Sequence, residues 1–187
     1  LTGNNSKLKP ANFHTCFNSV DFFEDNFPFV ITSNNKTKND ENLENVDVVV
    51  NNAGLALGRD FFDEASLDDW EVMIDTNVKG LLYVTKAMLP YLIKTGKGHI
   101  VNIGSTAGME VYEKGNVYCA TKHAVEALSK SMRIDLVRHN IKVTAIHPGA
   151  ADTEFSIVRF KGDASKAKAV YDGFTPLYAK DVAEVAY

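Results

Sequence analysis

Three short runs of β-branched and apolar residues, separated by two longer helical segments, constrain the fold of this chain most strongly. The runs are Val46–Val50, His99–Ile103 and Ile141–Ile146. Their composition is typical of strands that are covered on both faces of a sheet. The order strand, helix, strand, helix, strand predicts an α/β domain built around a parallel sheet.

The two helices have clear signals of their own. Ser66-Leu-Asp-Asp69 has the shape of a capping box, with Asp in place of the usual Glu or Gln. Apolar residues then follow at helical steps of three, four and seven, namely Leu67, Trp70, Ile74 and Leu81. A second helix is predicted from about residue 116 to residue 138.

Composition excludes several classes of protein. A length of 187 residues suits one domain. With 24 acidic and 20 basic residues the net charge is −4, which disfavours a nucleic-acid partner. No apolar run approaches the roughly 20 residues needed to span a bilayer. We therefore expect no membrane partner. Cys16 and Cys119 have neither a metal nor a redox spacing, so we expect no metal site and a cytoplasmic protein.

The first 45 residues differ from the rest of the chain. They contain ten Asn and no sustained helical period, although Phe27–Thr32 is compatible with a strand. The chain starts at Leu1 and stops at Tyr187 within a predicted helix. We therefore expect a fragment or a gene model with faulty ends, in which 1–45 is a divergent N-terminal part and 46–187 is the core of a single domain.

Small or polar clusters follow all three predicted strands. They are Asn51–Gly54, Gly104–Gly108 and Pro148–Gly149. In an open parallel sheet, ligands bind at the carboxyl ends of the strands. Each cluster alone is compatible with an ordinary tight turn. Together they locate the candidate site at this edge of the sheet.

Tyr118 and Lys122 lie four residues apart on the second predicted helix. This spacing turns about 400°, so both side chains point the same way, roughly 6 Å apart along the axis. An ammonium beside a phenol lowers the pKa of the phenol from its usual value near 10. Such a Tyr can exchange a proton with a substrate near neutral pH. Chance also produces such pairs in a chain with this composition, so the pair alone leaves catalysis open.

Ser105 and Asn77 are two further candidates. Ser105 stands between Gly104 and Gly108, where its hydroxyl can orient a substrate carbonyl or simply end a strand. A nucleophilic role is not supported, because His123 lies about 140° round the helix from Tyr118. Asn77 lies either in a local helix break, where it can contact a chain of water molecules, or on the surface of a helix that tolerates Asn there.

The ordered set of motifs resembles the short-chain dehydrogenase/reductase family from about Val46 to Tyr187. The resemblance implies a Rossmann-like, doubly wound parallel sheet with helices on both faces. It further implies that Tyr118 is the proton donor, that Lys122 lowers its pKa and holds the nicotinamide ribose, that Ser105 orients the carbonyl and that Asn77 anchors a proton-relay water. The implied cofactor contacts are Asn52, Ala53, Gly54, Tyr118, Lys122, Pro148, Gly149 and Thr153. A homodimer or homotetramer is implied as well.

Three segments resemble more narrowly the NADP-dependent 3-hydroxy acid dehydrogenases, namely Asn51–Gly58, Thr153–Asp163 and Thr175–Leu177. This resemblance implies hydride transfer between NADP, with NAD as second choice, and a small 3-hydroxy acid such as serine or allo-threonine. Such substrates carry a carboxylate, for which Arg159 is the candidate partner.

Residues 1–45 depart from the family pattern. Leu1-Thr-Gly3 is similar to the start of the Gly-rich phosphate turn, but Asn4-Asn-Ser-Lys7 follows instead of further glycines. Two βα crossings of about 30 residues each do not fit before residue 50. We expect the sheet to be incomplete at the N-terminal βαβ unit and at the C-terminal strand. One interpretation makes Val30–Ser33 the second strand, with Lys36 or Lys38 meeting a 2′-phosphate.

Three functions remain open from the sequence. The first is the NADP-dependent dehydrogenase acting on a hydroxy acid. The second is a non-catalytic relic that acts as an oligomerisation or interaction module. The third is a reductase of another carbonyl substrate, such as a 3-oxoacyl thioester.

Overall fold

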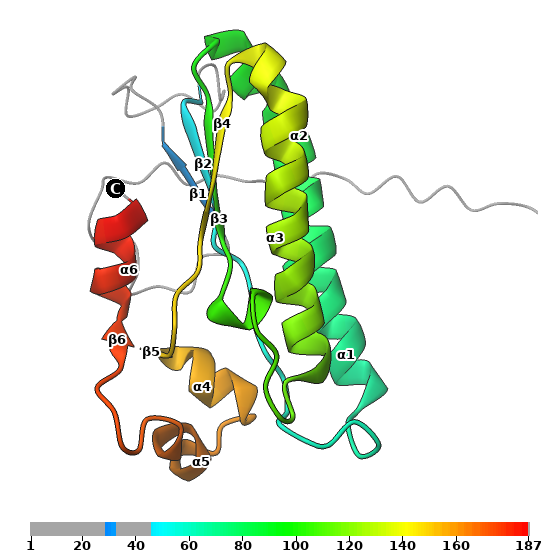
Figure 1. Ribbon diagram of the computed structural model, residues 1–187, viewed down its shortest axis with the longest axis vertical. Coiled ribbons are helices and arrows are strands. Elements are labelled where there is room, and N and C mark those ends of the chain that lie inside the picture. The colour runs from blue at the N-terminus through cyan, green and yellow to red at the C-terminus, as the bar shows by residue number, and fades with distance from the viewer. Residues whose placement is uncertain (1–28, 33–45, 187) are drawn as a thin grey trace, which may run out of the picture.

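A four-stranded sheet forms the centre of the computed structural model, which describes residues 29–32 and 46–186 (Figure 1). The strands are β1 (Phe29–Thr32), β2 (Val48–Asn51), β3 (His99–Ile103) and β4 (Lys142–Ile146), in the order β1-β2-β3-β4. β2, β3 and β4 are parallel, with His99 opposite both Val48 and Lys142. The predicted α/β class and the three predicted parallel strands are confirmed.

β1 runs antiparallel to β2, with Phe29 opposite Asn51. A strand within Phe27–Thr32 is therefore confirmed, but its interpretation as a parallel second strand is wrong. A parallel neighbour needs a crossover connection, whereas an antiparallel one does not, and the local sequence does not distinguish the two. Lys36, Lys38 and the residues that resemble the phosphate turn lie outside the described residues.

Two long helical segments connect the parallel strands. Between β2 and β3 lie α1 (Leu67–Ile74), the π-helical η2 (Asp75–Gly80) and α2 (Leu81–Thr95). Between β3 and β4 lie η3 (Thr106–Gly108), α3 (Asn116–Leu136) and the short η4 (Val137–His139). The Ser66 hydroxyl accepts a hydrogen bond from the Asp69 amide at 3.4 Å, as the capping box predicts.

α2 and α3 lie side by side against one face of the sheet (Figure 1). The core between these helices and the sheet consists of apolar residues from both layers, namely Val46, Val49, Met88, Leu92, Ile100, Leu136, Ile141 and Val143. Complete burial of one such side chain stabilises the fold by about 1.5–3 kcal/mol. Of the described helices, α6 (Ala179–Ala186) lies on the opposite side of the sheet in Figure 1. The helical layer that positions the site is therefore the α2–α3 layer.

The chain after β4 passes across the carboxyl ends of the strands (Figure 1). It forms β5 (Ala151–Asp152), α4 (Glu154–Arg159), α5 (Ala164–Ala169) and β6 (Leu177–Tyr178) before α6. β5 and β6 pair in a second, parallel sheet. In the part of the chain that the structure describes, no helix combines the length and the apolar character that a membrane span requires.

Candidate functional site

The strand-end clusters meet as the sequence predicts. The Gly104 amide donates to the Ile146 carbonyl at 2.7 Å, and the Thr106 amide donates to the Pro148 carbonyl at 3.0 Å. On its other side this loop touches α3, where a Cβ at Gly108 would lie only 2.5 Å from a backbone oxygen. Glycine is therefore required at 108, because any side chain would push the loop away from the helix. These contacts hold Ser105 beside α3.

Tyr118 and Lys122 lie on the same side of α3, as their spacing predicts. Both are buried, and only 8% of Tyr118 and 5% of Lys122 is exposed. The Tyr118 ring packs against Phe155 of α4, with ring centroids 5.6 Å apart. The Lys122 ammonium lies 6.0 Å from the centroid of the Tyr118 ring and donates to the Ile103 carbonyl at 3.0 Å.

Burial dominates the ionisation of both groups. It raises the pKa of Tyr118 to about 12, although a hydrogen bond with Ser105 and the charge of Arg159 oppose it. Burial also lowers the pKa of Lys122 to about 8. The expected lowering of the Tyr118 pKa by Lys122 is therefore wrong for this state of the protein. The cost of removing a phenolate from water exceeds what the surrounding positive charge restores.

Lys122→Met is expected to stabilise the protein. The unfolded chain binds the Lys122 proton more tightly than the folded one, with pKa values of 10.5 and about 8. This penalty is complete below about pH 8 and disappears as the pH rises toward 10.5. Allowing for the lost bond to the Ile103 carbonyl, we expect the free energy of unfolding at neutral pH to rise by about 1–2 kcal/mol.

Urea unfolding of both proteins at neutral and alkaline pH measures this effect. The advantage of Lys122→Met should shrink toward alkaline pH. Lys130→Met on the same helix is the matched control, because the Lys130 side chain is 64% exposed and its removal should change the stability by less than about 0.5 kcal/mol. A Lys122→Met protein that is less stable than wild type at neutral pH would contradict the argument.

Asn77 is buried within the π-helical segment η2, and only 1% of the residue is exposed. The regular α-helix is interrupted here by a π-helical segment rather than broken, and the alternative of a surface Asn is wrong. Its Oδ1 accepts from the Leu55 amide at 2.8 Å, while its Nδ2 donates to the Leu55 carbonyl at 2.8 Å and to the Thr121 hydroxyl at 3.0 Å. The side chain thus ties the loop after β2 to α3.

Replacing Asn77 by Ala is expected to lower the free energy of unfolding by about 2–4 kcal/mol, because it leaves the half-buried amide and carbonyl of Leu55 without their partner. Thermal or urea unfolding measures the change. Thr95→Ala is a suitable comparison, since among the described residues the Thr95 hydroxyl makes one hydrogen bond, to the Leu92 carbonyl of its own helix. Equal losses in the two variants would contradict a tethering role for Asn77.

The loop after β2 leaves room for a ligand beside Lys122. A Cβ at Gly54 would lie 3.1 Å from the Lys122 Nζ and 3.4 Å from the Asn77 Oδ1. Asn52 and Ala53 precede Gly54 in this loop and are half-buried. Among the described residues no carboxylate forms an ion pair with Lys122. A buried ammonium with donors to spare fits a sugar hydroxyl, so the residues present suit the nicotinamide-ribose end of a dinucleotide.

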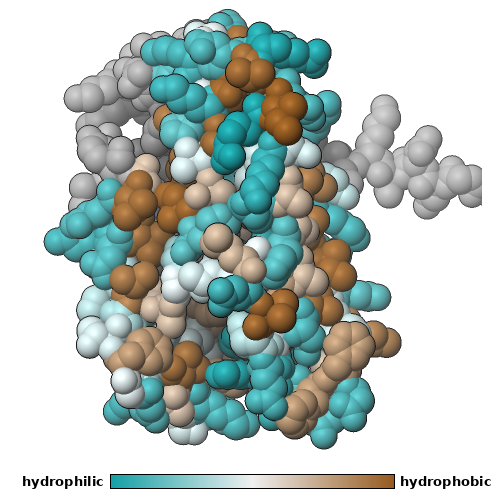
Figure 2. All heavy atoms as spheres, in the orientation of Figure 1, coloured by the Kyte–Doolittle hydropathy of each residue, from teal (hydrophilic) through white to brown (hydrophobic). Residues whose placement is uncertain are grey.

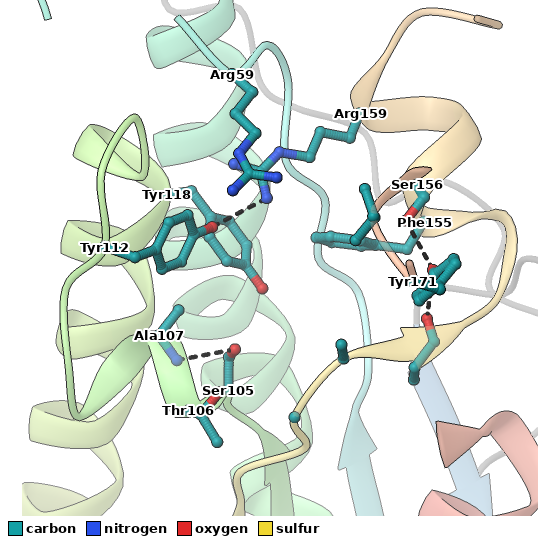
Figure 3. Close-up of a pocket in the computed structure, with 14 residues that line it drawn as sticks. Arg59, Ser105, Thr106, Ala107, Tyr112, Tyr118, Phe155, Ser156, Arg159 and Tyr171 are labelled. Atoms are coloured by element: carbon teal, nitrogen blue, oxygen red, sulfur yellow. Dashed lines mark hydrogen bonds between the residues drawn. The ribbon is translucent and has the colours of Figure 1, made fainter. Parts of the chain in front are cut away.

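A pocket of about 260 Å³ opens in front of Tyr118 (Figure 3). It is lined by the Ser105 loop, by α3 and by the chain after β4, including Gly149 and Phe155. Thr153 caps α4 at the side of this pocket, where its hydroxyl accepts from the Phe155 amide at 3.2 Å. Pro148 stands at the start of the same segment. The structure thus brings the predicted residues of all three strand ends around one site.

Arg159 reaches into this pocket from α4 (Figure 3). Its guanidinium donates to the Tyr112 hydroxyl at 2.9 Å and to the Gly58 carbonyl at 3.2 Å. The guanidinium carbon lies 5.6 Å from the centroid of the Tyr118 ring. Only 8% of Arg159 is exposed, and no carboxylate of the described residues forms an ion pair with it. A buried cation of this kind is suited to bind an anionic ligand.

Several residues of the site were not identified from the sequence. Arg59 and Tyr112 line the pocket from irregular loops, which have no periodicity to reveal them. The Tyr171 hydroxyl joins the Ser156 hydroxyl at 2.7 Å and the Ala151 carbonyl at 2.8 Å, which holds the chain after α5 to β5. Tyr171 carries no local signal either. In the described ranges no cluster of three or more His, Cys, Asp or Glu could hold a metal.

Comparison with known proteins identifies the family. The model of the short chain dehydrogenases matches residues 32–163, well over half of the chain. This chain belongs to the short-chain dehydrogenase family. Its pocket and the residues around Tyr118 lie within or directly beside the matched part, and the family membership predicted from the motifs is confirmed.

Two relatives are similar to this chain over most of its length. The NADP-dependent 3-hydroxy acid dehydrogenase YdfG of Salmonella typhi is 52% identical over 143 residues, which are 76% of this chain and 58% of the relative. The NADP-dependent 3-hydroxy acid dehydrogenase of Schizosaccharomyces pombe is 45% identical over 140 residues, which are 75% of this chain and 54% of the relative. The chain therefore spans less than two thirds of the length of these relatives.

A solved structure is similar as well. The closed form of a serine dehydrogenase complexed with NADP⁺ superimposes on this chain with a TM-score of 0.74 and 52% identity. The match covers 76% of this chain and 58% of the other. The Rossmann-like fold predicted from the motifs is confirmed by this likeness.

Proposed function

We propose that the protein is an NADP-dependent dehydrogenase that acts on a small 3-hydroxy acid such as serine or allo-threonine. The observation that carries the proposal is the pocket in which Ser105 and Tyr118 lie beside a buried Arg159 with no carboxylate partner in the described structure. The first two side chains suit a hydroxyl or carbonyl group, and the third suits a carboxylate. A 3-hydroxy acid carries both groups.

Tyr118 exchanges the proton in this mechanism. When bound, the nicotinamide cofactor supplies the hydride acceptor or donor. The Tyr118 hydroxyl gives a proton to the forming alkoxide during carbonyl reduction and takes it back during alcohol oxidation. A pKa of about 12 keeps the proton on Tyr118 at neutral pH, which is the state that a proton donor needs. Ser105, which lines the same pocket as Tyr118, orients the substrate oxygen.

Lys122 and Asn77 support the proton transfer. Lys122 holds the ribose hydroxyls with the ammonium donors that the Ile103 carbonyl does not use. The side-chain amide of Asn77 already makes three hydrogen bonds, to Leu55 and Thr121. The backbone carbonyl of Asn77 is therefore the group that would hold the relay water. Asn77 thus acts through its main chain in this proposal.

The remaining cofactor contacts belong to the loops at the strand ends. We assign Asn52, Ala53 and Gly54 after β2, and Pro148, Gly149 and Thr153 after β4. The preference for NADP over NAD is supported by the printed names of the relatives. The candidate phosphate contacts Lys36 and Lys38 lie outside the described residues.

Assembly and location are further parts of the proposal. Large apolar side chains are exposed on α2 and on the end of α3, with Tyr83 67% and Ile134 75% exposed. Brown apolar groups are scattered among teal ones on the face that Figure 2 shows. These residues support a homodimer or homotetramer, which light scattering during gel filtration measures. The free and buried Cys119 is consistent with a reducing compartment such as the cytoplasm.

Fluorescence titration with NADPH and NADH is the first test, with Lys122→Ala as the control. We expect micromolar NADPH binding that Lys122→Ala weakens at least tenfold, followed by NADP-dependent oxidation of serine. Absence of binding up to millimolar cofactor would overturn the proposal for this chain. That result would favour a relic that retains the catalytic side chains without the means to bind a dinucleotide.

A further inference from the structure

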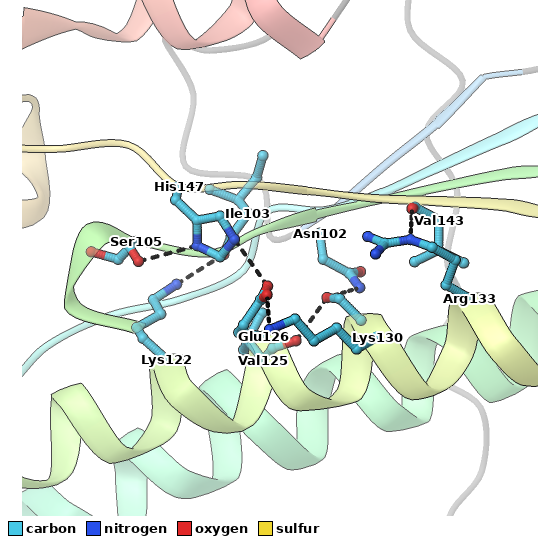
Figure 4. A network of polar contacts seen from close by, with 11 residues as sticks. Asn102, Ile103, Ser105, Lys122, Val125, Glu126, Lys130, Arg133, Val143 and His147 are labelled. Atoms are coloured by element: carbon cyan, nitrogen blue, oxygen red, sulfur yellow. Dashed lines mark hydrogen bonds and ion pairs between the residues drawn. The ribbon is translucent and has the colours of Figure 1, made fainter. Parts of the chain in front are cut away.

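A row of charged side chains continues along α3 beyond the site. Tyr118, Lys122, Glu126 and Lys130 follow one another at four-residue steps, so each lies about 40° round the helix from the one before. A Glu126 carboxylate oxygen lies 3.0 Å from the Nε2 of His147, which follows β4, and the other lies 2.8 Å from the Lys130 ammonium (Figure 4). The row thus joins α3 to the chain segment that precedes Pro148.

His147 also contacts the loop that carries the candidate catalytic Ser105. Its Nδ1 lies 3.2 Å from the Ser105 carbonyl oxygen (Figure 4). That carbonyl accepts a second hydrogen bond, at 2.8 Å, from the Gly108 amide. A Cβ at Gly104 would lie 2.5 Å from the same Nδ1, so only glycine at 104 lets the ring approach the loop this closely.

Both ring nitrogens of His147 face acceptor oxygens. A carbonyl oxygen only accepts, and an ionised carboxylate only accepts. The Lys130 ammonium, followed by the charge and hydrogen bond of His147, holds the pKa of the Glu126 carboxyl below its usual value. The His147 ring thus lies between two acceptor oxygens, one on α3 and one on the Ser105 loop.

We propose that His147 is a positioning residue, whose ring lies between the Glu126 carboxylate and the Ser105 carbonyl and so fixes the Ser105 backbone beside Tyr118. This role rests on the proposed function of Ser105. The ring contacts α3 through Nε2 and the Ser105 loop through Nδ1, so it links the helix that carries Tyr118 to the loop that carries Ser105. His147 touches no substrate in this arrangement and acts through Ser105 alone.

Two substitutions of His147 separate its two hydrogen bonds. His147→Asn places an amide nitrogen near the position of Nδ1 and keeps the donor to Ser105, but it does not reach Glu126. His147→Phe keeps a ring of similar size and removes both ring nitrogens. His123→Phe is the matched control, because His123 is exposed and its Nδ1 faces the Cys119 carbonyl of its own helix at 2.9 Å.

Two measurements test the positioning role. The first is amide hydrogen exchange of residues 105–108, and the second is kcat and KM for NADP-dependent oxidation of serine. For His147→Phe we expect exchange to accelerate and kcat to fall by about tenfold each, the scale of one lost hydrogen bond, while KM for NADP changes less than about twofold. His147→Asn should retain at least half of the wild-type kcat and protection, and His123→Phe should match wild type.

The outcomes separate this inference from the proposed function. Wild-type exchange rates in His147→Phe, or equal damage in His147→Asn and His147→Phe, would overturn the positioning role. Absence of turnover in the wild-type protein would overturn the proposed function instead. In that case the exchange rates of residues 105–108 still decide whether His147 holds the loop.

Discussion

Replacing Tyr118 by Phe is expected to lower kcat for NADP-dependent oxidation of serine by about a thousandfold, the scale of a lost general acid or base. Phe retains the ring that packs against Phe155 and removes only the hydroxyl that faces Ser105. The fold and the affinity for NADPH should therefore stay close to wild type. Steady-state kinetics combined with a fluorescence titration of NADPH measures the two effects separately.

The pH dependence of the wild-type rate tests the same residue. Oxidation needs the phenolate of Tyr118, and burial raises the pKa of this group to about 12. We expect kcat for oxidation to rise through the alkaline range, whereas carbonyl reduction, which needs the phenol, should not rise with pH. The rise should be absent from the residual activity of Tyr118→Phe. A control is Tyr83→Phe, because Tyr83 is 67% exposed on α2 and far from the chemistry. A Tyr118→Phe protein as active as this control would exclude Tyr118 as the proton donor.

Replacing Arg159 by Met is expected to raise KM for serine by about 10- to 100-fold, the range of one hydrogen-bonded charge pair. Met keeps much of the length and apolar packing of the side chain but cannot bind a carboxylate. Affinity for NADPH should change less than about threefold, since Arg159 faces the substrate side of the pocket beside Tyr112. Arg159→Lys should recover only part of the affinity, because an ammonium does not reproduce the planar, bidentate contact.

Two comparisons make the Arg159 prediction sharp. The first is ethanolamine, an amino alcohol that lacks the carboxylate of serine. Wild type should prefer serine strongly, and Arg159→Met should lose most of that preference. The second is Arg59→Met, because Arg59 lines the same pocket but is exposed and should matter less. An unchanged KM for serine in Arg159→Met, in a protein that still binds NADPH, would exclude Arg159 as the carboxylate partner.

The secondary structure was largely predictable because it depends on neighbours in the sequence. The β-branched runs became β2, β3 and β4, and Ser66 caps α1 as its spacing with Asp69 predicts. The four-residue step between Tyr118 and Lys122 places both on one side of α3. Strand ends gather in a parallel sheet regardless of side-chain detail, so the location of the site also followed from the strand pattern.

The tertiary structure decided the direction of β1, the burial of Asn77 and the ionisation of Tyr118. β1 could have paired in either direction, and only its contact with β2 shows that it is antiparallel. The local sequence is compatible with Asn77 as a surface residue, and only the fold shows that Leu55 and Thr121 pack against it. The pKa of Tyr118 rises, rather than falling, because packing removes water from the phenol, and no spacing along the chain encodes that loss of water.

The same distinction separates the residues of the site. The sequence by itself determined which side chains near the strand ends are capable of proton transfer. Helical periodicity and strand order depend on residues that are close together in the sequence, so both can be predicted from it. Only the fold decided that Arg159 is buried beside Tyr118 and that His147 joins Ser105 to Glu126. Those contacts join residues 21 to 42 positions apart, and their energies come from burial and long-range pairing that neighbouring residues do not specify.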